Sequence, residues 1–166
     1  MIYLVLYIAT IFGANWAIAT FGFIPVWPGL LAPAGVLFVG ASFTLRDLTQ
    51  ERLGKGAVLG AVVVGAALSA LVSPQFALAS GASFLLSEFA DFAVYTPLAR
   101  RRLVAAVVAS STAGLIVDSV VFLWLAFGSL EFLLGQIVGK LWMVLIAVPF
   151  VAYLRRRDER LGLKAA

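Results

Sequence analysis

Cysteine and histidine are both absent from the 166 residues of this chain. Their absence excludes disulfides, thiol catalysis, imidazole bases and the usual zinc or haem ligands, and we expect no cofactor. Charge is also scarce: only 12% of residues are charged, whereas 63% are hydrophobic. Together with a mean hydropathy of +1.09, this composition lies far from that of a soluble domain and indicates an integral membrane protein.

The apolar runs are long and do not alternate with polar residues, so they favour membrane-spanning helices over a transmembrane barrel. The net charge of +4 does not indicate nucleic-acid binding, because the basic residues stand at the ends of the apolar runs, where membrane topology explains them. We predict an all-α bundle of six transmembrane helices forming one domain over residues 1–166. The predicted spans, each near the length a bilayer requires, are approximately Ile2–Phe21, Pro28–Leu48, Gly56–Val72, Phe76–Leu98, Val104–Phe127 and Phe132–Leu154.

Lysine and arginine cluster on alternate connections of this arrangement. Arg46, Arg52 and Lys55 lie near the second-to-third connection and the triplet 100–102 at the fourth-to-fifth, while five more basic residues between 155 and 164 follow the sixth span. The other three connections carry none, so the positive-inside rule predicts that both termini are cytoplasmic in a cell inner membrane. The N-terminal run lacks a basic n-region, which favours a span over a signal peptide.

The fourth predicted span contains two acidic residues, Glu88 and Asp91. An ionisable side chain within a membrane costs a few kcal/mol or more, so it usually faces a bundle interior and has a function. Ser80, Ser83 and Ser87 share a helical face with the two acids, at spacings of three and four residues. This stripe predicts a helix that lines an internal site.

Four polar side chains from four predicted spans lie at similar depth. At about 1.5 Å per residue, Asn15, Lys140, Asp118 and Glu88 lie about 9, 12, 14 and 17 Å from the outer edge. We therefore predict a shared polar site in the outer half of the membrane, with separate structural hydrogen bonds as the alternative. Asp118 and Lys140 are expected to form a buried ion pair that fixes the helix register, borders the site, or does both.

The other charges leave several interpretations open. Glu88 and Asp91 have no obvious basic partner within the spans, so each could be protonated, bind a cationic ligand or accept hydrogen bonds; Asp91 could instead meet the arginine triplet. Arg46 and Asp47 lie near the cytoplasmic surface, where a gate-forming or solvated salt bridge and ligand binding are equally open. Deep aromatic residues such as Phe84 and Trp142 would stack on a planar ligand or simply pack.

Four segments and Asn15 carry a family resemblance. The segments are FTLRDLTQERLGK at 43–55, ASGASFLLSEFADFAVYTPL at 79–98, SSTAGLIVDSVVFLWLAF at 110–127 and GQIVGKLWMVLIAVP at 135–149. In these features the chain resembles the VUT family, the putative vitamin uptake transporters that take up queuosine precursors. It is shorter than typical members and has an acid near position 88 where others have a small or amide residue.

The resemblance implies uptake of a 7-deazaguanine, such as 7-cyano-7-deazaguanine or its aminomethyl form. A carboxylate, from Glu88 or Asp118, could accept the adjacent N–H and NH₂ of the guanine-like edge. Amide and ammonium groups would face the carbonyl and ring nitrogens, and a cationic aminomethyl ligand would favour a spare carboxylate. The predicted substrate-binding residues are Asn15, Phe84, Ser87, Glu88, Asp91, Asp118, Gln136, Lys140 and Trp142.

Other functions are weighed against this one. A substrate-binding membrane subunit that requires a separate energising complex is the main alternative. An aspartyl intramembrane enzyme needs two carboxylates in contact, but Asp91 and Asp118 differ in depth by about 8 Å. An inert pore-forming protein fits poorly with a convergent layer of charges. The expected partners are a small molecule and membrane lipid, not nucleic acid, and a homo-oligomer is compatible with the sequence.

Overall fold

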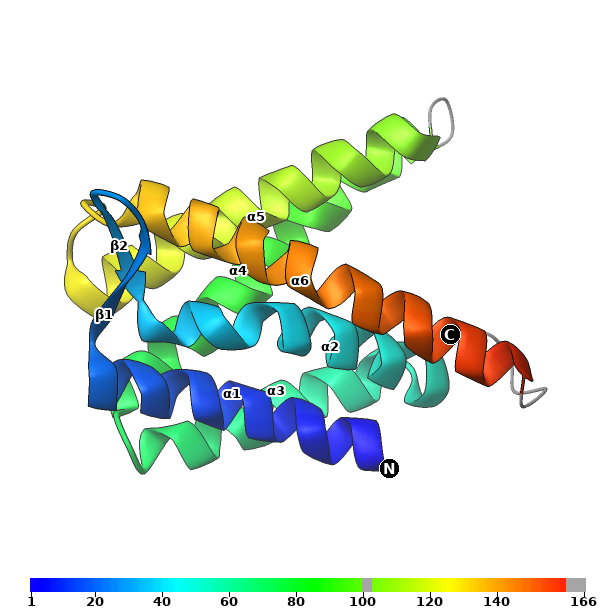
Figure 1. The fold of residues 1–166 in the computed structure, drawn as a ribbon, viewed down its shortest axis with the longest axis horizontal. Helices are drawn as coiled ribbons and strands as arrows, with labels where there is room; N and C mark the ends of the chain where they lie inside the picture. The colour runs from blue at the N-terminus through cyan, green and yellow to red at the C-terminus, as the bar shows by residue number, and fades with distance from the viewer. Residues whose placement is uncertain (100–102, 161–166) are drawn as a thin grey trace.

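The computed structural model describes residues 1–99 and 103–160, and within these residues the chain forms six α-helices, a β-hairpin and a 3₁₀-helix (Figure 1). The Arg100–Arg102 triplet and Lys164, which contribute to the predicted topology, lie outside the described residues. The elements are α1 (Ile2–Phe21), β1 (Phe23–Trp27), β2 (Leu30–Pro33), η1 (Ala34–Phe38), α2 (Val39–Leu53), α3 (Lys55–Ala70), α4 (Pro74–Ala99), α5 (Leu103–Phe127) and α6 (Leu133–Arg160).

The helical membrane class is confirmed by length and hydropathy. Among the described residues, three helical segments are long and apolar enough to cross a membrane: Ile2–Phe21, Pro74–Leu98 and Val108–Phe127. Lys55–Ala70 and Leu133–Ala147 are shorter apolar helices. Six spans therefore stay a prediction, whereas a multi-pass membrane protein is what these helices indicate.

The second predicted span is replaced by a more complex segment. Instead of a helix over Pro28–Leu48, the chain forms the turn into β2, which pairs with the preceding β1 in a hairpin, then η1, and then an α2 that begins only at Val39. The reason is local: Pro28 and Gly29 form the turn, and Gly29 has a φ of 77°, the value of the third residue in a type II turn. The prolines also lack the N–H that a helix interior needs.

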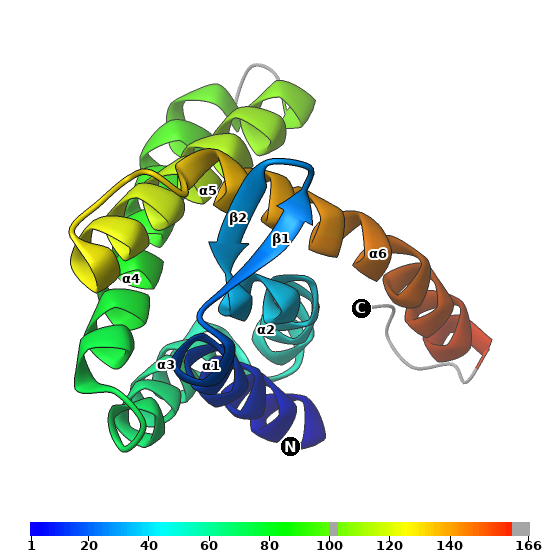
Figure 2. The same cartoon turned by 60° about the vertical axis from the view of Figure 1, so that its left-hand side comes forward.

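The helices lie roughly along one axis and define two ends of the molecule (Figures 1 and 2). The hairpin end carries β1 and β2 together with the α3–α4 and α5–α6 connections. The terminal end carries the N-terminus, the α2–α3 connection and the end of α6 (Figure 1). Helices α4 and α5 pack against each other along much of their length, α1 packs on α2 and α3, and α6 packs on α2 and the hairpin. Toward the terminal end the α4–α5 pair diverges from α6 (Figure 1).

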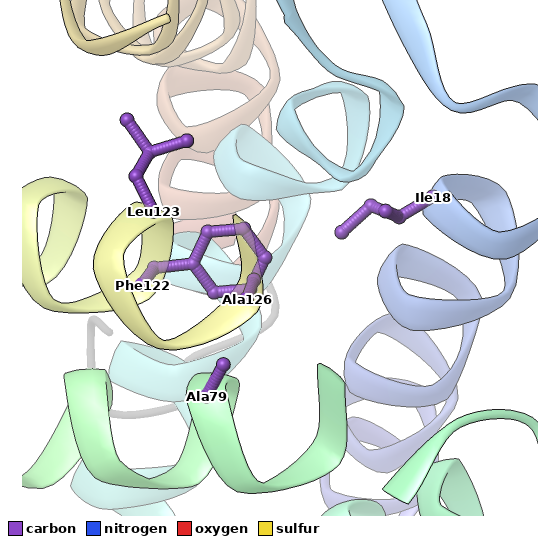
Figure 3. Close-up of a cluster of buried hydrophobic side chains, with 5 residues drawn as sticks. All are labelled: Ile18, Ala79, Phe122, Leu123 and Ala126. Atoms are coloured by element: carbon purple, nitrogen blue, oxygen red, sulfur yellow. The ribbon is translucent and has the colours of Figure 1, made fainter. Parts of the chain in front are cut away.

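One cluster of buried apolar residues lies at the hairpin end. Ile18 of α1 points toward Phe122 of α5, and Ala79 of α4 completes this cluster with two further α5 residues, Leu123 and Ala126 (Figure 3). Phe23 of β1 extends the cluster, with its ring centroid 4.9 Å from that of Phe127 and 4.1 Å from that of Phe132. We call Phe23, Phe76, Phe122, Phe127 and Phe132 the phenylalanine cluster. It joins β1 to α4, α5 and the start of the α6 segment at the hairpin end.

Two glycines allow α6 to approach its neighbours closely. A Cβ atom on Gly135 would clash with the carbonyl oxygen of Leu31 in β2, and one on Gly40 would clash with the carbonyl oxygen of Met143. Because no side chain intervenes, α6 lies directly against both β2 and α2. This contact fixes the first turns of α6, which carry two of the predicted site residues.

Candidate functional site

A cavity of about 160 Å³ lies between the helices and is lined by residues from all six of them, from η1 and from Pro33 of β2. At 10–15 Å³ for each water molecule, this volume holds on the order of ten waters. The wall is mostly apolar, which is typical of small-molecule sites. Its charged and amide-bearing side chains are Asn15, Arg46, Asp118, Gln136 and Lys140.

Five of the predicted site residues line this one cavity: Asn15, Phe84, Asp118, Gln136 and Lys140. Arg46, which the sequence placed at a gate or a surface salt bridge, lines it as well. These six residues come from α1, α2, α4, α5 and α6, so the convergence is a property of the fold rather than of one segment.

The remaining predicted residues lie outside the cavity wall. Ser87 donates a hydrogen bond to the carbonyl of Phe84 within its own helix, at 2.8 Å. Asp91 faces α5, where a Cβ on Gly114 would lie 3.7 Å from its own; the described residues include no ion-pair partner for it. Trp142 is 42% exposed and stacks on Trp27, with ring centroids 6.1 Å apart. Its indole therefore contacts the hairpin rather than the cavity.

The expected ion pair between Asp118 of α5 and Lys140 of α6 is confirmed. Lys140 is 3% exposed, and its ammonium donates to Asp118 Oδ2 and, at 2.8 Å, to the hydroxyl of the fully buried Ser119. An unpaired ammonium at this depth would be far more costly than the pair. The pair thus neutralises both charges and joins α5 to α6.

Glu88 has a basic partner that was not obvious from the sequence. The carboxylate of Glu88 in α4 lies 2.7 Å from Nη1 of Arg46 in α2. The sequence did not reveal this contact, because the predicted span from Pro28 places Arg46 near its end. With α2 running from Val39 to Leu53, Arg46 lies seven residues, or about 10 Å, inside the helix end. Asp47 Oδ1 is 3.5 Å from Nε of Arg46, on a side chain that is 73% exposed.

Asn15 is 1% exposed and forms hydrogen bonds to three helices. Its amide Nδ2 donates to the carbonyl of Ile11 and to the hydroxyl of Ser69 in α3, both at 3.1 Å. Its Oδ1 accepts a bond of 2.9 Å from the hydroxyl of Ser80 in α4. Both amide protons are therefore used within the protein, and Asn15 holds α1 against α3 and α4 in the cavity wall.

Gln136 differs from Asn15 because its side-chain amide has no partner among the described residues. It is 5% exposed, and its Oε1 is buried without a hydrogen bond. Buried polar atoms are nearly always paired, so an unpaired one in a cavity wall indicates a group that meets a ligand or water.

Two hydroxyl-bearing residues of the wall, Tyr7 and Ser42, were not predicted. Helical spacing could have identified both. Tyr7 lies eight residues before Asn15 and Ser42 four before Arg46, so each shares a helix face with a residue that was singled out. The apolar surroundings of both residues hid this signal.

Comparison with known proteins adds one match. The family model described as putative vitamin uptake transporter matches residues 71–154, about half of the chain. The match covers α4, α5 and most of α6, including Phe84, Asp118, Gln136 and Lys140 in the cavity wall. Neither the curated proteins nor the solved structures contain a match to this chain.

Proposed function

We propose that this chain, which belongs to the putative vitamin uptake transporter family, imports a 7-deazaguanine precursor of queuosine across the cell inner membrane. The family indicates an uptake transporter and not an enzyme; the substrate is our proposal. The candidates are 7-cyano-7-deazaguanine and its aminomethyl form.

The cavity is the observation that carries this proposal. It lies between apolar helices, and its wall combines a few convergent polar groups with the aromatic rings of Phe84 and Phe122. Sites of this composition suit small planar molecules, which need apolar faces and a few oriented hydrogen bonds. A fused two-ring base has both.

In the proposed topology the chain crosses the membrane six times, with β2, η1 and α2 together forming the second crossing, and the terminal end faces the cytoplasm. Arg52 and Lys55 flank the α2–α3 connection at that end, which is the side that the positive-inside rule assigns to the cytoplasm. The phenylalanine cluster would then close the cavity toward the outside. The pair of Arg46 and Glu88 would form part of the gate toward the cytoplasm, with Asp47 beside it.

Transport would require these two barriers to open alternately. The α4–α5 pair is the proposed moving part, because its extensive contacts are internal and it diverges from α6 toward the terminal end. Opening that end would separate Arg46 from Glu88, whereas opening the other would separate the rings of the phenylalanine cluster. In this scheme Ser87 and Asp91, which lie beyond Phe84 on α4, would border the exit path rather than the binding site.

A second candidate is a substrate-binding membrane subunit driven by a separate energising complex. It is favoured by the outer face of α3, where Gly56 and Gly60 are exposed and a Cβ on either would meet no atom within 4 Å. Such a smooth face allows close packing of another helix.

Uptake of radiolabelled 7-cyano-7-deazaguanine tests the proposal in cells that lack both deazaguanine synthesis and an energising complex. We expect uptake when this chain alone is expressed, and no uptake of guanine or riboflavin. Uptake that needs an added energising complex would favour the second candidate. Failure of the purified, folded protein to bind any deazapurine would overturn the substrate assignment.

A further inference from the structure

The charged side chains in the cavity wall neutralise one another or are neutralised from behind it. Asp118 pairs with Lys140, and Arg46 pairs with Glu88. Arg46, Asp118 and Lys140 are the charged side chains among the described lining residues. A ligand in the cavity therefore meets no unpaired charge.

This pairing disfavours a charged ligand. A cationic amine would have to share Asp118 with the ammonium of Lys140, which is 3% exposed, and the two like charges would lie side by side. A like charge nearby disfavours the charged form of a group in a poorly solvated site. An anion would likewise have to share Arg46 or Lys140 with the carboxylate already paired to it. An uncharged ligand leaves both pairs intact.

Gln136 provides an unused hydrogen-bonding edge in this neutral wall. A primary amide carries an acceptor oxygen and an NH₂ donor side by side, and Oε1 of Gln136 is buried without a partner. The backbone beneath it is held in place, because its N–H donates to the carbonyl of Phe132 at 2.9 Å and because Gly135 lies directly against Leu31. The point from which the side chain extends is therefore fixed relative to the cavity.

A lactam is the chemical group that complements this edge. Its N–H would donate to Oε1 of Gln136 while its carbonyl accepts from Nε2, in two parallel hydrogen bonds. The gain is large because the buried Oε1 otherwise stays unsatisfied, and sites built this way strongly reject analogues that lack the matching group.

We infer that the cavity selects an uncharged heterocycle with a lactam edge, and that Gln136 is the specificity-determining residue that binds this edge. This inference rests on the proposed transport function and deepens it. It assigns the guanine-like edge to an amide rather than to the paired carboxylate of Asp118. It also implies a preference for the neutral nitrile base over its cationic aminomethyl form.

We would measure the equilibrium binding of three probes to the purified full-length protein, to distinguish the effect of ligand charge from the effect of the lactam edge. 7-Cyano-7-deazaguanine is neutral with a lactam, 7-aminomethyl-7-deazaguanine is cationic with the same lactam, and 7-cyano-7-deazaadenine is neutral without one. We expect the first to bind at least about ten-fold tighter than either of the others, the effect of losing one or two net hydrogen bonds in the adenine form and of placing a second cation beside the buried ammonium of Lys140 in the aminomethyl form.

Two substitutions at one position then test the residue. Gln136→Met should abolish the discrimination between the guanine and adenine forms, because the amide edge is gone. Gln136→Glu should invert the charge preference and favour the aminomethyl cation, because it places an unpaired carboxylate in the wall; a merely structural residue would not produce this inversion. Gln50→Met, the same change in α2 outside the cavity, should keep the wild-type order.

The inference is overturned if the wild type binds the aminomethyl cation at least as tightly as the nitrile. It is also overturned if Gln136→Met keeps the wild-type preference for the lactam. If the wild type binds none of the three probes, the proposed function itself is overturned, and the inference with it. The two failures are therefore distinguishable.

Discussion

Arg46 Nη1 lies 2.7 Å from Glu88 Oε1, and this ion pair joins α2 to α4, two helices that make few other contacts. This ion pair lies where α4 and α5 would separate from the rest of the bundle. In the proposed mechanism it therefore breaks each time the cytoplasmic side opens.

Substitution of Glu88 tests this gate. Glu88→Gln removes the counter-charge of Arg46, whose side chain is 25% exposed, so the closed state loses the ion pair between α2 and α4. Uptake should fall about ten-fold, as expected when a charge-assisted hydrogen bond is lost. Initial uptake rates of a 7-deazaguanine measure the effect. Asp47→Asn is the matched control and should change uptake less, because that carboxylate is 73% exposed and screened by solvent.

The exchanged pair distinguishes a gate from a simple need for either residue. Arg46→Glu combined with Glu88→Arg keeps both charges and should recover part of the uptake that each single change removes. Equal loss in the single and double variants would contradict the gate.

Breaking the Asp118–Lys140 pair should have unequal effects on stability. Asp118→Asn leaves the 3% exposed Lys140 without its counter-charge and should cost about 3 kcal/mol. Lys140→Met should cost less, since the Asp118 side chain is 29% exposed and reaches the cavity. Thermal unfolding in detergent gives the order, and the double variant should be more stable than Asp118→Asn alone. The opposite order would mean that Asp118 is the more deeply buried charge.

Asn15→Ala should act on stability rather than on substrate choice. It removes the bonds to Ser69 and Ser80 and leaves two hydroxyls without their partner, at a cost of about 2 kcal/mol. Thr10→Ala on the same helix is the control, because Thr10 bonds only its own helix, to the carbonyl of Tyr7. A change in the relative binding of deazapurines in Asn15→Ala, without loss of melting temperature, would instead place its amide on the ligand.

Gly135→Ala should displace the hairpin from α6. Its methyl group would clash with the carbonyl of Leu31, which is backbone and cannot rotate away, so we expect a loss of about 1–3 kcal/mol. Gly56→Ala, where a Cβ would meet no atom within 4 Å, should be neutral or stabilising because alanine favours helix. Similar melting temperatures for the two variants would exclude the tight contact between β2 and α6.

The sequence could predict the helical membrane class and the Asp118–Lys140 pair, because a few charges in long apolar runs must meet one another. It missed the hairpin, since hydropathy is the same for an apolar strand and an apolar helix. The Pro28–Gly29 turn was the available signal. That error hid the contact of Arg46 with Glu88, because the register of α2 depends on where it begins. The sequence also could not distinguish the two amides of the site. The side-chain amide of Asn15 forms all its hydrogen bonds within the protein, whereas Oε1 of Gln136 has no hydrogen-bond partner among the described residues.

The absence of cysteine permits a direct test of whether the cavity is the binding site. In Ser42→Cys the single thiol would lie in the cavity wall, whereas in Ser129→Cys it would lie in the α5–α6 connection at the hairpin end. We would measure the rate at which a small thiol reagent modifies each variant, with and without saturating 7-cyano-7-deazaguanine. The ligand should slow modification at position 42 and leave position 129 unchanged. Binding of the ligand with no protection at position 42 would contradict the assignment of the cavity as the transport site.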